Sequence, residues 1–173
     1  VSFELADYRE INGEYDKIYS VGMFEHVGRK FYNKFFKSIN KLLKTDGSFL
    51  LHTIGVVDKP SPPNKFINRY IFPGGICPSL SQITKSIEKT GLIVSDTETL
   101  IRHYDKTLLS WLERFTAKKD LVKDMFDEKF VKMWSFYLAS CAAAFRYRDL
   151  VVFQLQIVKN FNAARPTRDY IYS

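Results

Sequence analysis

Apolar residues follow two different spacings along the 173-residue chain, and their alternation predicts an α/β domain. Two runs, Tyr15–Gly22 and Ser48–Ile54, are largely apolar and predict buried strands. Between them, over Phe31–Leu43, large apolar residues recur every three or four positions with lysines opposite, which predicts an amphipathic helix. A strand, a helix and a strand in this order predict a right-handed βαβ unit with parallel strands.

The remaining pattern continues this alternation toward the C-terminus. Asp46-Gly47 predicts a turn before the second strand, and Ser79 is placed to cap a helix that runs to Lys89. We also expect a short strand at Ser2–Ala6, a Pro-rich loop at Val56–Pro63, strands at Gly91–Leu100 and Leu150–Val158, and helices at Thr107–Lys118 and Glu128–Arg146. One domain is therefore expected over residues 1–160, and a disordered tail over residues 161–173.

Composition narrows the class of partner. The net charge of +7 and the pI of about 9.3 favour anionic partners. Lys and Arg are scattered, and no RNA-binding signature is present, so nucleic acid ranks below an anionic lipid surface. Cys77 and Cys141 have no second Cys or His at ligand spacing, so we expect no metal site and no disulfide. Without a signal-peptide pattern or a long apolar run, the expected location is cytoplasmic.

Polar residues at strand ends give the best physical indication of a site. Asp7 and Tyr8 follow the first expected strand, Glu25 follows the second and His52 closes the third. In sheets of this kind, ligands bind at the carboxyl ends of the strands. Each residue also has a structural interpretation: Glu25 can start a helix, His52 can be a hydrogen-bonded core residue, and Tyr104 can be a core tyrosine.

Five blocks of sequence carry a resemblance to a known family. They are YDKIYSVGMFEHVGRKFYNKFF, LLHTIG, NRYIFPGGICPSLSQI, HYDKTLLSWLERF and YLASCAAAFRYRD, in this order between Asp7 and Val158. Together they resemble the cyclopropane-fatty-acyl-phospholipid synthases and the similar mycolic acid cyclopropane synthases. The resemblance implies a class I SAM-dependent methyltransferase fold, which is Rossmann-like with a mostly parallel sheet, here without its N-terminal cofactor-binding strands. Residues 1–160 would form the C-terminal part of that catalytic domain.

The resemblance also implies a reaction. Family members transfer a methylene group from S-adenosylmethionine to the cis double bond of an unsaturated acyl chain in a membrane phospholipid. The product is a cyclopropane fatty acid, formed through a carbocation that a bound bicarbonate ion deprotonates. The implied bicarbonate ligands are Glu25, His52, the backbone N–H of Ile54, and Tyr104.

Further site residues follow from the same resemblance. Cys141 corresponds to a cysteine described as catalytic in the family, although its place on an apolar helix face is typical of an inert, packed thiol. The cofactor-binding residues would be Asp7, Tyr8 and Arg9, where the mycolate enzymes instead have a Trp-Glu pair. The acyl channel would be lined by Phe66, Tyr70 and Phe72, for which a packed lid is the alternative.

Several interpretations stay open from the sequence. The family's Gly-rich cofactor loop lies upstream of Asp7, so we expect the isolated chain to be inactive. The alternatives are a fatty-acid methyltransferase without ring closure, a non-catalytic lipid-binding fragment, and an RNA methyltransferase. The expected partners are an unsaturated acyl phospholipid and an anionic membrane surface that the protein contacts peripherally, and a homodimer is left open.

Overall fold

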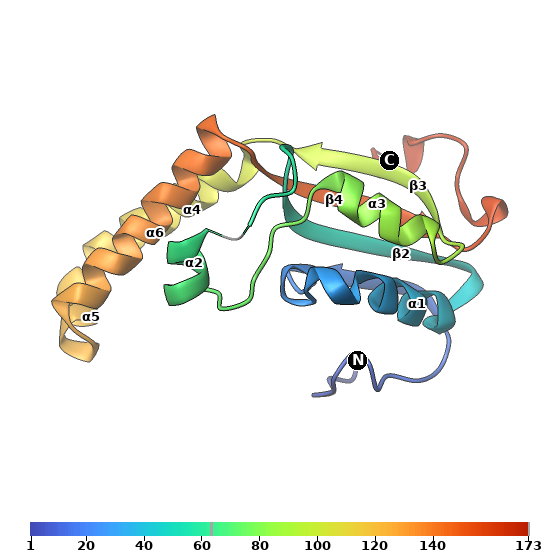
Figure 1. Ribbon diagram of the computed structural model, residues 1–173, viewed down its shortest axis with the longest axis horizontal. Coiled ribbons are helices and arrows are strands. Elements are labelled where there is room, and N and C mark those ends of the chain that lie inside the picture. Colours follow the sequence, from blue (N-terminus) through green and yellow to red (C-terminus); the bar gives the residue numbers. More distant parts are fainter. Residues whose placement is uncertain (63, 173) are drawn as a thin grey trace.

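A four-stranded sheet organises the protein, as the computed structural model shows for residues 1–62 and 64–172 (Figure 1). The strand order is β1-β2-β4-β3. β1 runs parallel to β2, and β4 runs antiparallel to both β2 and β3, so three of the four strands share one direction. The strands are β1 Tyr15–Val21, β2 Leu43–Val56, β3 Ile93–Leu100 and β4 Leu150–Val158.

Helices form two groups around this sheet (Figure 1). α1 and α3 cover one face, whereas α4 and α6 lie side by side and extend away from one end of the sheet, with α5 at their far end. The helices are α1 Tyr32–Leu42, α2 Lys65–Tyr70, α3 Leu80–Glu88, α4 His103–Ala117, α5 Lys119–Met125 and α6 Glu128–Tyr147. No helix of residues 1–62 and 64–172 is both long and apolar enough to span a bilayer.

The core has two parts that meet at the sheet. The first lies between the sheet and the pair α1 and α3, and it contains the fully buried Phe24, Phe35 and Phe49. The second lies where α4 and α6 meet β4, and it contains Leu108 and Phe145. Because successive side chains of a strand point to opposite faces, β2 contributes Phe49 and Leu51 to the first part and Ile54 to the edge of the second.

Most of the expected elements are confirmed. β4 has the expected bounds, and β1, β2 and β3 overlap the other three main strand predictions. Ser79 begins α3 in a capping box, in which the Gln82 side chain accepts from the Ser79 backbone N–H at 3.1 Å. The helix predicted over Phe31–Leu43 is α1, which begins and ends one residue inside those bounds.

Two local predictions in the first third of the chain are wrong. Ser2–Ala6 is not a strand: Phe3 and Leu5 are fully exposed, and no strand of the described chain lies beside them to supply backbone hydrogen bonds. Asp46-Gly47 is not a turn but part of the 14-residue β2. A Cβ on Gly47 would lie 2.8 Å from the Leu43 side chain and 3.0 Å from the Asp16 carbonyl, so this glycine serves close packing.

Other differences concern the helical hairpin, which consists of α4, α5 and α6, and the C-terminal tail after Asn160. α5 was not predicted, and α4 begins four residues earlier than expected, directly after Arg102 in the left-handed conformation with φ 63°. Beyond Asn160 the chain turns back to the sheet, where Arg168 pairs with Asp96 at 2.8 Å and the Tyr170 hydroxyl donates to Gln156 at 2.7 Å. Disorder of residues 161–173 stays a prediction. Pro63 of the expected loop and Ser173 lie outside the described residues.

Candidate functional site

Glu25 and Ile54 meet at the carboxyl ends of the two parallel strands. The Ile54 backbone N–H donates to Glu25 Oε1 at 2.6 Å. Glu25 is 8% exposed, and its second oxygen, Oε2, is buried without a partner among the described residues. The structure therefore brings together two of the four predicted anion-binding residues and leaves one buried carboxylate oxygen free to accept a hydrogen bond.

The backbone around Glu25 is anchored on several sides. Gly22 directly follows β1 with φ 66°, a conformation that favours glycine, and its N–H donates to the His52 carbonyl at 3.2 Å. Phe24 stacks on Tyr32 of α1 with ring centroids 4.3 Å apart. The Glu25 carbonyl accepts from the Ile76 N–H at 2.9 Å. Glu25 is thus held in place by β2, by α1 and by the loop before α3.

His52 lies on β2 two residues before Ile54, so both side chains face the same side of the sheet. The imidazole is partly buried, and its Nδ1 lies 3.1 Å from Gln154 Nε2 on β4. An amide nitrogen can only donate, so Nδ1 accepts in this arrangement. In the neutral ring the proton is then on Nε2, which makes His52 a donor toward a ligand.

Tyr104 occupies the first turn of α4 and packs in the second part of the core. Its ring stacks on Phe145 at 5.3 Å and meets the edge of Trp111 at 6.0 Å. Ile54 packs against the same cluster. In the part of the chain that the structure describes, Tyr104 makes no hydrogen bond to Glu25 or His52. Tyr104 is therefore connected to the site through this shared apolar cluster.

The two cysteines lie in buried surroundings. Cys141 packs in the second part of the core, and burial raises the pKa of its thiol to about 11. Cys77, which the sequence did not single out as a site residue, follows the Ile76 that binds Glu25. Burial, and secondarily the nearby Glu25 carboxylate, raise the pKa of the Cys77 thiol to about 12. Both groups are therefore protonated near neutral pH, which does not favour a nucleophilic role.

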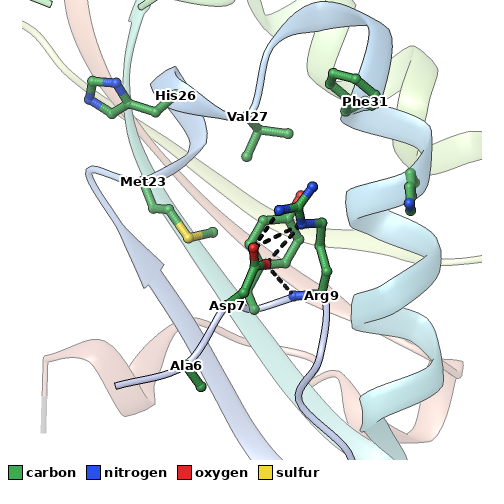
Figure 2. Close-up of a pocket in the computed structure, with 9 residues that line it drawn as sticks. Ala6, Asp7, Arg9, Met23, His26, Val27 and Phe31 are labelled. Atoms are coloured by element: carbon green, nitrogen blue, oxygen red, sulfur yellow. Dashed lines mark hydrogen bonds and ion pairs between the residues drawn. The ribbon is translucent and has the colours of Figure 1, made fainter. Parts of the chain in front are cut away.

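An open pocket of about 460 Å³ lies beside the turn that follows β1. Asp7, Tyr8 and Arg9 line this pocket (Figure 2). The Arg9 guanidinium folds back onto Asp7, with Nε 2.9 Å from Oδ1, and these hydrogen bonds lower the pKa of the Asp7 carboxyl to about 2. The sequence reasoning missed most of the opposite wall. That wall consists of Met23, His26, Val27, Phe31 and Lys34, which come from the turn after β1 and from α1.

Aromatic side chains connect α2 and the residues directly after it to α6 and to the turn after β1. Phe66 meets Phe136 of α6 at 5.0 Å and Tyr70 at 5.5 Å. Phe72 meets His26 at 5.6 Å and Tyr137 of α6 at 6.2 Å. Phe72 thus lies between α6 and the turn after β1, whereas Phe66 contacts α6 and Tyr70 contacts Phe66. The described residues contain no group of three or more potential metal ligands.

Comparison with known proteins identifies the relationship. The family described as Mycolic acid cyclopropane synthetase matches residues 1–155. The chain belongs to this family. It is 43% identical over 155 residues to the cyclopropane-fatty-acyl-phospholipid synthase of Escherichia coli, an alignment that covers 90% of this chain and 40% of that protein. It is also 34% identical to the tuberculostearic acid methyltransferase UfaA1 of Mycobacterium tuberculosis, covering 92% of this chain and 39% of that protein.

Solved structures agree with this membership in the cyclopropane synthetase family. The cyclopropane synthase MmaA2 from Mycobacterium tuberculosis superposes with a TM-score of 0.81 at 32% identity, covering 89% of this chain and 59% of that chain. Coclaurine N-methyltransferase bound to SAH, at 24% identity and a TM-score of 0.72, shares the fold alone. The predicted class I SAM-dependent methyltransferase fold is therefore confirmed. The chain spans 40% of the length of the Escherichia coli relative.

Proposed function

We propose that the full-length protein carrying this chain converts unsaturated acyl chains of membrane phospholipids into cyclopropane fatty acids with S-adenosylmethionine as the methylene donor. The observation that carries the proposal is the buried Glu25 carboxylate, with Oε1 bound to the Ile54 N–H and Oε2 without a partner in residues 1–62 and 64–172. A buried polar atom without a partner indicates a place for a polar ligand. Family membership gives the class of reaction.

The donor set around Glu25 fits a bicarbonate ion. Glu25 Oε2 can accept the hydroxyl of bicarbonate, while His52 Nε2 and the Tyr104 hydroxyl can donate to its negative oxygens. When bound, bicarbonate supplies the base that removes a proton from the carbocation. The chain itself orients the acceptor through the Ile54 N–H and fixes the His52 proton on Nε2 through Gln154.

The pocket beside Asp7 fits the adenosine part of the cofactor. Its volume of about 460 Å³ lies within the range that is usual for small-molecule sites, about 300–1,000 Å³. Tyr8, Met23 and Val27 offer faces to a flat ring, and the Asp7 carboxylate, held by Arg9, can accept from an exocyclic amine. S-adenosylmethionine supplies the methyl group, and these residues bind and orient it.

The acyl chain is proposed to lie against Phe66, Tyr70 and Phe72. Burial of alkyl groups against such side chains is favourable by about 25 cal/mol for each Å² removed from water. The net charge of +7 supports peripheral contact with an anionic membrane surface from the cytoplasmic side. Cys141 is placed here as a packing residue of the same region rather than as a nucleophile.

A second candidate function is fatty-acid methylation, which the sequence identity to tuberculostearic acid methyltransferase UfaA1 supports. In that case the protein would add a methyl branch without ring closure. The two reactions differ in how the carbocation is quenched, so the proton acceptor near Glu25 is the feature that separates them. A non-catalytic lipid-binding protein is the remaining alternative.

The test uses the full-length protein with Glu25→Gln, His52→Gln and Tyr104→Phe, each assayed on unsaturated phospholipid vesicles with S-adenosylmethionine. Each variant is expected to lose about 10²–10³-fold in kcat, the usual cost of removing one hydrogen bond that stabilises developing charge. Glu88→Gln, an exposed carboxylate on α3, is the matched control and should keep normal activity. Normal activity in all three site variants would exclude the proposed anion site.

A further inference from the structure

We infer that the ion pair between Asp105 and Arg146 is a positioning device for Tyr104. Arg146 Nε donates to Asp105 Oδ2 at 2.7 Å and joins the first turn of α4 to the last turn of α6, across 41 residues of sequence. The inference rests on the proposed role of Tyr104 and adds two residues to it. Neither Asp105 nor Arg146 lines the pocket beside Asp7 or contacts Glu25.

The pair is the most buried of the ion pairs in the described chain. Asp105 is 4% exposed, whereas the carboxylates paired with Lys44 and Lys132 are well exposed. Exposed pairs contribute about 0–1 kcal/mol and fix little geometry. A buried carboxylate needs its partner, because a charge without one is costly to remove from water. α4 and α6 are therefore held in one relative register at this point.

Tyr104 is connected to both members of the ion pair through the sequence and through ring stacking. It directly precedes Asp105, and its ring stacks at 5.3 Å on Phe145, which directly precedes Arg146. Trp111 makes a T-shaped contact with the same ring at 6.0 Å between ring centroids. Breaking the ion pair lets the first turn of α4 shift against Phe145, and the Tyr104 hydroxyl moves with that turn.

The start of α4 has no side-chain capping hydrogen bond. Arg102, in the N-cap position, has a left-handed backbone and no side-chain cap bond. The helix therefore begins without the usual side-chain hydrogen bond that fixes a first turn. The Arg146 bond is the side-chain hydrogen bond that joins the first turn of α4 to α6. It therefore constrains the turn that carries Tyr104, together with the ring contacts to Phe145 and Trp111.

The experiment is a double-mutant cycle in the full-length protein. Arg146→Lys keeps the charge but removes the Nε donor, and Asp105→Asn keeps the shape but removes the charge. Each is made in the parent protein and in Tyr104→Phe, and kcat and KM are measured for variants with native circular dichroism. We expect kcat to fall about 10–100-fold in the parent with KM changed less than about twofold, and to fall less than about twofold in Tyr104→Phe.

Two results would overturn the inference and they are distinguishable. Equal losses of kcat in both backgrounds would show that the pair supports the fold without acting through Tyr104. Normal activity of Tyr104→Phe itself would remove the proposed role of that tyrosine, and the inference with it. The exposed pair Lys132–Glu128 on α6 supplies the control, since Lys132→Met should leave kcat unchanged. If Asp105→Asn does not fold, the comparison stands on Arg146→Lys.

Discussion

The Ile54 backbone N–H donates to the Glu25 carboxylate at 2.6 Å, so a buried side chain ties the turn after β1 to the end of β2. Glu25→Ala removes the acceptor and leaves this N–H without a partner. We expect the free energy of unfolding to fall by about 1–3 kcal/mol. Glu25→Gln keeps the Oε1 acceptor, so its loss should stay under about 1 kcal/mol. Urea unfolding gives the free energy of unfolding of each variant. Equal values for Glu25→Ala and Glu25→Gln would show that the hydrogen bond contributes little.

How far the sequence predicted this arrangement depends on the range of the interactions involved. β4 and α3 were predicted accurately because the alternation in Leu150–Val158 and the capping residue Ser79 are local signals. Gly47 was taken for a turn because the feature that requires glycine there, the Asp16 carbonyl on a neighbouring strand, is distant in sequence. The same reasoning applies to Ser2–Ala6. Its local pattern predicts a strand, but in the described chain no strand lies beside it.

The candidate site likewise has residues that local sequence signals predicted and residues that only the folded chain brings together. Glu25 and His52 were singled out from strand ends and Ile54 from the sequence blocks, and in the structure Glu25 and Ile54 are in contact. Gln154, which orients His52, lies 102 residues away and carries no motif. Cys77 near Glu25, and the pocket wall formed by Met23 and Val27, likewise depend on the folded chain.

A second prediction concerns the tautomer of His52. Gln154→Leu removes the amide that donates to Nδ1, so the ring proton is no longer held on Nε2. We expect kcat of the full-length protein to fall about 10-fold, as for loss of an orienting partner elsewhere. Proton–nitrogen NMR of the imidazole should show mixed tautomers in the variant. A single Nε2–H tautomer in Gln154→Leu would contradict the prediction.

A third prediction concerns pH and the two thiols. Burial raises the pKa of Cys141 to about 11 and that of Cys77 to about 12, above the value of about 8.5 for an exposed thiol. The unfolded chain therefore loses these protons first, and the free energy of unfolding should decrease as pH rises from about 8.5 toward 11. The double variant Cys77→Ala, Cys141→Ala should lose less stability over this interval. Equal pH dependence in the parent and the double variant would contradict it.

The same pKa shifts predict the chemistry of Cys141. Because the thiol is protonated at neutral pH, alkylation by iodoacetamide in the folded protein should be slow and should accelerate only in strongly alkaline solution. Cys141→Ser in the full-length protein should keep kcat within about fivefold, since the proposed reaction uses no thiol nucleophile. A loss of 10³-fold or more would instead indicate direct participation of the thiol.

A fifth prediction concerns the cofactor. The pocket beside Asp7 is open, and Tyr19 on the neighbouring strand β1 is 77% exposed, so we expect the 173 residues alone to offer only part of a binding surface. We expect no micromolar affinity for S-adenosylmethionine in calorimetric titration of this chain. In the full-length protein, Arg9→Ala releases Asp7 and should weaken binding about 10-fold. Micromolar binding by the isolated 173 residues would refute the first expectation.

The central claim is that the full-length protein closes a cyclopropane ring on a phospholipid acyl chain. The most direct measurement is proton NMR and mass spectrometry of lipids from a host without cyclopropane lipids that expresses the protein. We predict the addition of one methylene group with high-field ring-proton signals, and their absence in Glu25→Gln. A methyl branch without ring protons, or ring formation that is unchanged in Glu25→Gln, would contradict the account.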